Sequence, residues 1–339
     1  MQKLPPHLVQ HAIRFWPATN TLNKKVASGY DGRDITVVTS FFDLGRGDWK
    51  VAGGKNSPFQ RSLEHYFQYF SHLAKLKNPM VIFVAPEHAQ RVLDLRKAAG
   101  LEGITSVFTI SELFEIDEVK ALVAEVQSKM TPAFQSWVRF PKAPEFTQPR
   151  YAVLDALKSI FVNTAIAAKA VPTEQVAWLD FGYARDENCF DAAKSWRFDA
   201  GRKINLFHMR PMDDMPNFKV VQRGYVYFQG GCKIGPVGAW PAFSEAIDHA
   251  LAGLLTSDLV DDEQTLLLIA WRANPERYRI HAMDRRDWRV AIRFFNESMT
   301  GGDVQFRDYR FVNALKEGGP GKVLRALAAA AGRVTDKFS

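Results

Sequence analysis

Apolar, β-branched segments of strand length alternate with segments of helical spacing, and this alternation constrains the fold more than any other feature. The strand-like segments are 35–42, 80–85, 106–110 and 175–180. The helical segments are 61–76, 87–99, 111–129, for which Ser111 is the expected N-cap, and 151–169. Strands separated by helices predict an α/β fold with a mixed, mostly parallel sheet flanked by helices, in a single large domain.

The sequence changes character beyond residue 186. We expect strands at 203–208 and 219–228, a glycine-rich turn at 230–238, helices at 241–255 and 263–273, strands at 278–282 and 288–294, and a closing helix at 322–331. Shorter strands and longer connections make this half less regular. Residues 1–33 contain scattered prolines and are expected to form an N-terminal extension before a domain that spans 34–339.

Composition excludes several classes of protein. The 339 residues are 47% hydrophobic and 24% charged, which is ordinary globular usage and argues against a disordered or collagenous chain. No apolar run reaches the length that a spanning helix needs. The two cysteines, Cys189 and Cys232, share no metal-ligand spacing. We therefore expect a cytoplasmic protein without a disulfide framework.

A carboxylate follows the strand that ends near residue 180. Asp180 and Gly182 come at its carboxyl end, which is where open α/β sheets bind ligands. A carboxylate there can hold Mg²⁺ or Mn²⁺ and so compensate the charge of a departing diphosphate. The spacing is Asp-x-Gly, so a second acidic ligand is absent. Equally, Asp180 can cap the next turn, with Gly182 supplying a positive φ.

Three other segments carry polar groups with competing interpretations. The loop after the first strand holds Arg46 between two glycines, which suits either phosphate oxygens or a plain turn. Acidic residues at 261–263 open a helix, which the helix dipole favours in any case, but a carboxylate of raised pKa there can also deprotonate a hydroxyl. Gly230 and Gly231 allow either a hairpin turn or close approach to a ligand.

Isolated residues give weaker signals. His208 and His281 can be metal ligands, although lone histidines in apolar strands are more often core residues. Lys158 can reach a phosphate, but a surface lysine is the favoured interpretation. Asp186 can be a second carboxylate or a surface residue.

The net charge of +7 is spread along the chain except for one concentration of arginines. Its members are Arg272, Arg277, Arg279, Arg285, Arg286, Arg289 and Arg293. A solvated basic face is the favoured interpretation, and contact with an anionic membrane or polymer is the alternative. No helix, zinc or RNA-binding motif accompanies the charge, so we expect no nucleic-acid partner.

Three segments together resemble the HtrL/YibB family of bacterial lipopolysaccharide and polysaccharide loci. They are Thr36–Trp49 (TVVTSFFDLGRGDW), Trp178–Tyr183 (WLDFGY) and Asp262–Gln264 (DEQ), within a resemblance that covers roughly 35–295. The resemblance implies a GT-A-like, Rossmann-type glycosyltransferase. It divides the domain into a nucleotide-binding half, 34–186, and an acceptor-side half, 187–339.

Carried over by position, the resemblance assigns residues to roles. The expected nucleotide-sugar contacts are Thr39, Phe41, Arg46, Asp180, Gly182, Gly230 and Gly231. Asp262 and Glu263 are the expected catalytic residues, and Asp180 is also the expected metal ligand, for Mn²⁺ or Mg²⁺.

The implied reaction is transfer of a sugar, of the hexosyltransferase type, from a UDP-sugar to a surface glycan or lipopolysaccharide acceptor. Peripheral contact with the anionic inner membrane is a further expectation. The alternative function is a non-catalytic protein of the envelope pathway that binds anionic lipid or polysaccharide.

Overall fold

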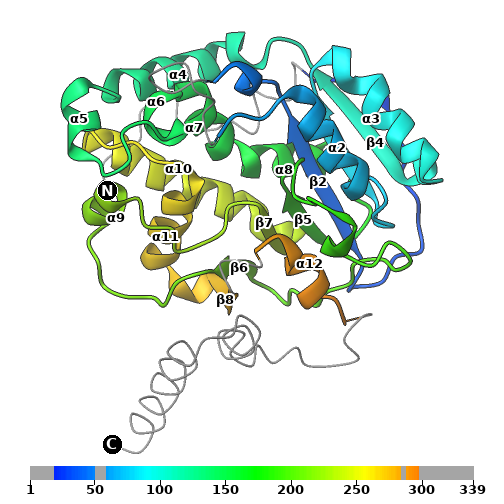
Figure 1. Ribbon diagram of the computed structural model, residues 1–339. Helices are drawn as coiled ribbons and strands as arrows, with labels where there is room; N and C mark the ends of the chain where they lie inside the picture. Colours follow the sequence, from blue (N-terminus) through cyan, green and yellow to red (C-terminus); the bar gives the residue numbers. More distant parts are fainter. Residues whose placement is uncertain (1–18, 50–58, 284–287, 298–339) are drawn as a thin grey trace, which may run out of the picture.

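A single mixed sheet organises the computed structural model, which describes residues 19–49, 59–283 and 288–297 (Figure 1). Within these ranges eight strands lie in the order β1-β4-β3-β2-β5-β7-β6-β8. Their bounds are β1 Thr19–Asn23, β2 Ile35–Phe41, β3 Met80–Val84, β4 Thr105–Ile110, β5 Gln175–Leu179, β6 Ile204–His208, β7 Cys232–Pro236 and β8 Tyr278–Ala282. The expected α/β architecture with a mixed, mostly parallel sheet is confirmed.

The centre of the sheet is parallel, and its strands are buried on both faces. β2, β3, β4 and β5 run in the same direction, with β2 between β3 and β5. The side chains of β3, β4 and β5 are buried throughout, which requires helices on both faces. β7 then pairs antiparallel with β5, and Leu179 lies opposite Cys232. The carboxyl end of β5 and the amino end of β7 therefore meet at one edge.

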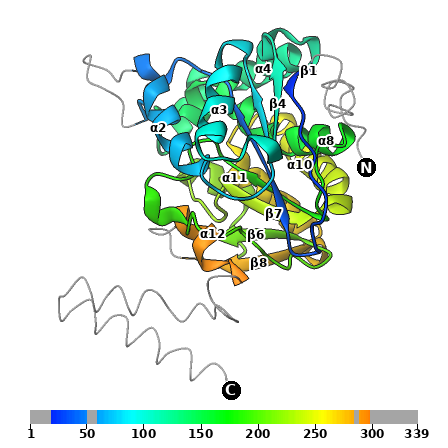
Figure 2. The same ribbon diagram turned by 90° about the vertical axis from the view of Figure 1, so that its right-hand side faces the viewer.

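Helices cover the two faces unequally. Their bounds are α2 Leu63–Leu73, α3 Pro86–Ala98, α4 Asp117–Lys129, α5 Pro132–Trp137, α6 Pro144–Thr147, α7 Pro149–Ala156, α8 Lys158–Ala167, α9 Asn217–Arg223, α10 Trp240–Thr256, α11 Glu263–Ala273 and α12 Ala291–Phe294. One core cluster joins the sheet to α4, α7, α8, α10 and α11. The other joins it to α2, α3 and α12. Figure 2 shows α12 next to β6 and β8 at the far edge of the sheet.

Two expected strands are helical. Residues 217–223 form α9, which starts after Pro216 and ends at Gly224 with φ of 58°. Its adjacent valines suggested a strand, but Val220 and Val221 are both buried on the helix. The expected strand at 288–294 is a short 3-10 turn followed by α12. In both places tertiary burial outweighs β propensity.

Other boundaries also differ from expectation. The helix expected from Ser111 begins at Asp117, after a 3-10 turn. The helix expected over 151–169 is interrupted at Leu157, where α7 ends and α8 begins. The expected turn at 230–238 contains β7. The expected helix at 322–331 lies outside the described residues. Among the helices described here, none combines the length and the apolar character that crossing a bilayer requires.

Candidate active site

A cavity of about 380 Å³ opens at the edge where β2 and β5 end and β7 begins. Most of the residues expected at a ligand site line it together. They are Phe41, Arg46, Asp180, Gly182, Gly230, Gly231, Asp262 and Glu263. Thr39 is not among the lining residues, because it lies fully buried inside β2. The parallel register of β2 and β5 explains the convergence, since it brings the loops after both strands to the same edge.

Phe41 contributes to the cavity floor through an aromatic cluster. Its ring stacks on Phe181 with the centroids 4.8 Å apart and makes an edge contact with Phe67 of α2. Gly182 follows in the same segment, where an added Cβ would approach the Tyr66 ring to 3.3 Å. The close packing of Tyr66 over this turn favours a residue without a side chain at position 182.

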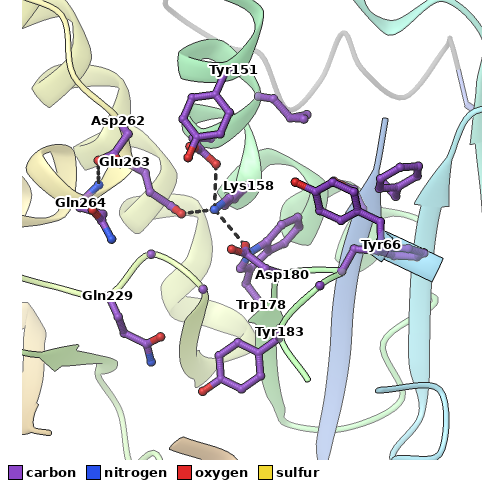
Figure 3. Close-up of a pocket in the computed structure, with 18 of the residues that line it drawn as sticks. Tyr66, Tyr151, Lys158, Trp178, Asp180, Tyr183, Gln229, Asp262, Glu263 and Gln264 are labelled. Carbon is purple, nitrogen blue, oxygen red and sulfur yellow. Dashed lines mark hydrogen bonds and ion pairs between the residues drawn. The ribbon is translucent and has the colours of Figure 1, made fainter. Parts of the chain in front are cut away.

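Asp180 projects from the end of β5 into a set of hydrogen bonds (Figure 3). The Trp178 indole donates to its carboxylate over 2.8 Å, and Lys158 Nζ lies 2.9 Å from it. Its backbone N–H donates to the Gly231 carbonyl, which ties β5 to the start of β7. Burial alone would raise the pKa of Asp180, but Lys158 and Lys233 outweigh burial and lower it. The group is therefore an ionised carboxylate at neutral pH.

Lys158 is a buried cation at the centre of the acidic wall, and the expectation of a surface lysine is wrong. It is the first residue of α8, and its ammonium contacts Asp155 and Asp180 at 2.9 Å and also Glu263 (Figure 3). Burial would lower the pKa of Lys158, yet the three carboxylates hold it well above its ordinary value. A lysine at a helix N-terminus opposes the helix dipole, so these carboxylates stabilise it there.

Glu263 bridges two buried lysines. One carboxylate oxygen accepts from Lys158 and the other from Lys233, whose ammonium also donates to the Gly230 carbonyl over 2.8 Å. Burial raises the pKa of Glu263 to about 7 although both lysines lower it. A side chain at position 230 would overlap the Glu263 carboxyl. Gly230 therefore acts by leaving room for this ion pair.

Asp262 is the N-cap of α11 and lines the cavity. It accepts a hydrogen bond from the Gln264 backbone over 2.9 Å. Burial, and then the charges of Asp261 and Glu145, raise the pKa of Asp262 well above its ordinary value. Asp261 is turned away from the lining and accepts from the Thr265 hydroxyl over 2.7 Å. Of the two expected catalytic residues, Asp262 is the one without a lysine partner in the described ranges.

Arg46 lies in the loop after β2, where Gly45 adopts a left-handed conformation with φ of 67°. Its two terminal nitrogens donate to the Tyr66 hydroxyl over 2.6 Å and to the Phe59 carbonyl over 3.0 Å. The guanidinium also lies 4.9 Å from the centroid of the Trp49 ring. Arg46 is only 8% exposed, and its Nε has no hydrogen-bond partner in the described residues.

The side chains do not fit a divalent metal ion as they stand. In the described ranges no group of three or more histidine, cysteine, aspartate or glutamate side chains is arranged to hold one. The Asp180 carboxylate is already bound by Lys158 and Trp178. His208 and His281 hydrogen-bond to the Arg210 carbonyl and to Asn205, respectively. These contacts give both histidines structural roles.

Comparison with known proteins places the chain in a family. Residues 33–297 match the sequence profile described as "Bacterial protein of unknown function (HtrL_YibB)". The chain belongs to the HtrL/YibB family. It is similar to Protein HtrL of Escherichia coli (strain K12), with 29% identity over 275 residues that cover 80% of this chain and 95% of the relative. The resemblance inferred from the sequence is confirmed.

The structural similarity between this HtrL/YibB member and the solved structures compared with it is low. Mouse xyloside xylosyltransferase 1, in its apo form, gives a TM-score of 0.34 at 10% identity, covering 74% of this chain and 84% of that one. The 4-diphosphocytidyl-2C-methyl-D-erythritol synthase from Anaerococcus prevotii DSM 20548 gives 0.31 at 12% identity, covering 76% and 92%. These overlaps are too loose to carry an activity, so any assignment depends on the cavity itself.

Several residues of the HtrL/YibB cavity went unrecognised in the sequence. They are Arg61, Tyr66, Tyr151, Asp155, Arg185 and Gln229 on the lining, and Lys233 behind it. Lys233 carried a usable signal, because a lysine between Cys232 and Ile234 in an apolar strand requires a buried partner. The others lie in helices and loops of ordinary composition.

The arginine concentration at 272–293 is only partly described. Arg285 and Arg286 lie outside the described residues. Arg272 donates to the Met215 and Asp213 carbonyls and to Asn217, so it holds the segment before α9 in place. A role in membrane or polymer binding stays a prediction.

Proposed function

We propose that this protein is a GT-A-like glycosyltransferase that moves a sugar from a UDP-sugar to a hydroxyl of a surface glycan or lipopolysaccharide acceptor. The observation that carries the proposal is one cavity whose lining combines carboxylates with a guanidinium. Asp180, Asp262, Glu263 and Arg46 of the first loop all line it. Glycosyl transfer needs both: cations for a leaving diphosphate and a carboxylate for the acceptor.

Asp262 is the proposed catalytic base. Burial and the charges of Asp261 and Glu145 raise the pKa of Asp262, and a carboxylate of higher pKa accepts a proton from a hydroxyl more readily than an ordinary aspartate does. The acceptor proton would pass to Asp262 while the acceptor oxygen attacks the anomeric carbon and the bond from that carbon to the diphosphate oxygen breaks, so that UDP leaves. Lys158 holds Asp180 and Glu263 in place beside it and keeps Asp180 ionised. In this proposal Asp180 orients the donor sugar by accepting hydrogen bonds from its hydroxyls.

Mn²⁺ or Mg²⁺ would supply Lewis-acid stabilisation of the diphosphate if either were bound. The carboxylates nearest to one another converge on the Lys158 ammonium, and no step of the proposed reaction is routed through a metal. Titrations with and without manganese therefore belong in the first test.

Calorimetric titration with UDP and several UDP-sugars, in EDTA and in manganese, tests the donor class. We expect saturable binding of UDP in at least one condition. Absence of nucleotide binding in every condition would rule the transferase out. If the protein instead co-sedimented with anionic liposomes, the non-catalytic envelope protein would become the better assignment.

Asp180→Asn tests the role of the Asp180 carboxylate. The readout is hydrolysis of a UDP-sugar, in which water replaces the acceptor and UDP is released. We expect a loss of about 100-fold or more, because asparagine cannot supply the carboxylate charge. Asp186→Asn is the matched control: Asp186 is exposed, lies outside the cavity and caps a 3-10 turn, which asparagine also does. Full activity of Asp180→Asn would remove Asp180 from the mechanism.

A further inference from the structure

Two arginines that the sequence did not single out line the cavity beside α2, whereas Lys158 and Glu263 of the ion-pair network begin α8 and α11. We propose that Arg61 and Arg185 bind the diphosphate of the nucleotide directly, as a pair of guanidinium groups. The inference rests on the proposed function, which supplies the nucleotide, and it names the residues that compensate its charge.

Arg185 follows β5 and Asp180 in the chain and turns back over α2. Its guanidinium lies 4.2 Å from the centroid of the Tyr69 ring, and its Nε is buried with no hydrogen-bond partner in the described residues. A buried N–H that lacks an acceptor costs free energy unless something else supplies the acceptor. Because Arg185 lines the cavity, a ligand oxygen can do so.

Arg61 reaches the same cavity from the residue before the N-cap of α2. Its backbone N–H donates to the Arg46 carbonyl over 3.2 Å, which fixes the start of α2 against the first loop. Burial, and next the nearby charge of Arg61, lower the pKa of Arg185. Two cations thus lie close enough to repel each other at a cavity wall.

The described residues provide no counter-charge for this pair. Neither Arg61 nor Arg185 forms an ion pair with any carboxylate in those ranges, whereas Lys158 contacts three carboxylates. Arg46, the arginine expected to hold phosphate, has both terminal nitrogens occupied by Tyr66 and Phe59. Arg46 also lacks a carboxylate partner in those ranges, and its Nε is unpaired, so Arg61 and Arg185 join it as lining cations whose charge no ion pair of the described residues compensates.

The chemistry of the pair selects a polyphosphate. Guanidinium groups offer parallel N–H donors that match phosphate oxygens in a bidentate manner. Two of them can compensate the charge of a diphosphate in the absence of a cation from solution. The carboxylates that also line the cavity would repel the same anion, so we expect the diphosphate to bind at the arginines and the sugar near the carboxylates.

The experiment is a calorimetric titration in EDTA with UDP, uridine and inorganic pyrophosphate. The variants are Arg61→Gln, Arg185→Gln, their combination and the conservative Arg185→Lys. Arg91→Gln is the control, because Arg91 is a surface arginine of α3 whose partner is Glu64. Thermal unfolding of each variant establishes that it is folded.

We expect each glutamine variant to weaken UDP binding by about tenfold or more, since each removes charged hydrogen bonds to phosphate. The double variant should lose pyrophosphate binding, and Arg185→Lys should fall between the wild type and Arg185→Gln. Uridine affinity should not change, because uridine carries no phosphate. A merely structural role would alter uridine and UDP binding alike.

The outcomes separate this inference from the proposed function. If wild-type protein binds UDP and the arginine variants match Arg91→Gln, the arginine site is overturned and the transferase stands. If UDP binds only in manganese and the variants bind normally there, the site is likewise overturned. If pyrophosphate binds through the arginines but UDP binds no better than pyrophosphate, the anion site stands and the nucleotide-sugar transferase fails.

Discussion

Arg96 and Arg185 are both at least partly buried, but their guanidinium groups differ in how fully they are hydrogen-bonded. Arg96, in α3, is fully buried, and all three of its nitrogens donate hydrogen bonds. The acceptors are the Thr105 hydroxyl and the carbonyls of Ala74, Leu76 and Asn78, at 2.7 to 3.0 Å. Arg185 is partly buried at the cavity wall, and its Nε has no acceptor in the described residues.

The difference shows how a structural arginine can be told from a binding one. Burial lowers the pKa of Arg96 to about 9, a cost that the polypeptide offsets by directing the carbonyls after α2 at the guanidinium. These contacts join α3 to the loop before β3 and to β4. Arg185 has no such set of acceptors, and it lies beside a cavity. Incomplete pairing at a cavity is therefore the feature that points to a ligand.

Replacing Arg96 should give the largest effect. Arg96→Met removes every donor from a dry site and leaves several acceptors unpaired, so we expect a loss of roughly 3–5 kcal/mol in the free energy of unfolding. Urea denaturation measures it. Arg91→Met, in the same helix but exposed, should change stability by less than about 1 kcal/mol. A small effect at Arg96 would mean that complete pairing does not identify a structural arginine.

An effect of intermediate size is expected in the pH dependence of stability. It comes from Asp261, an acidic group near the cavity that, like Arg185, lacks a counter-ion in the described ranges. Burial raises its pKa to about 7, Thr265 lowers it in part and Glu145 raises it. Between pH 4 and pH 7 the folded protein holds a proton that the unfolded chain has released. The contribution of Asp261 to stability is therefore fully present below about pH 4 and falls by on the order of 1–3 kcal/mol as pH rises to 7.

Asp261→Asn should flatten this pH dependence, because asparagine does not titrate. Urea denaturation of both proteins at pH 4, 5.5 and 7 measures the slope. If the two slopes were the same, Asp261 would be ionised throughout, and the acidic side would be better compensated than its contacts indicate.

Arg185→Gln should give the smallest change in stability. Glutamine removes a cation that lacks a counter-charge but also removes its contact with Tyr69, and we expect the two to leave the free energy of unfolding within about 0.5 kcal/mol of wild type. Urea denaturation without ligand measures it. If Arg185→Gln lowered the free energy of unfolding as much as Arg96→Met, Arg185 would be a structural residue like Arg96 and not a binding one.

Much of the fold was predictable because local patterns and burial agree in the parallel half. The segment 35–42 is β-branched and aromatic, and it forms β2 with nearly every residue buried. Prediction failed where tertiary contacts decide. Val220 and Val221 favour a strand by propensity, yet Pro216 and Gly224 delimit a helix there. The break at Leu157 separates α7 from α8 without a proline or glycine to mark it.

The site was predictable where a residue follows a strand or starts a helix. Asp180 and Asp262 were found in this way, since such positions converge at one sheet edge. Lys158 was misjudged because its three partners come from α7, the end of β5 and the start of α11, a combination that the sequence does not reveal. Arg185 was missed for the opposite reason: its significance lies in the partners that it lacks.

The contact between Lys158 and Glu263 joins residues 105 positions apart, which has a consequence for biosynthesis. Chains emerge from the ribosome amino end first, so the strands of the parallel half leave the tunnel well before Glu263 does. During that interval Lys158 has only Asp155 and Asp180 as partners, and the acceptor side of the cavity does not yet exist. A nascent chain halted before Asp262 would thus contain Arg46 and Asp180 but not the proposed base, and it would be catalytically silent until translation resumed.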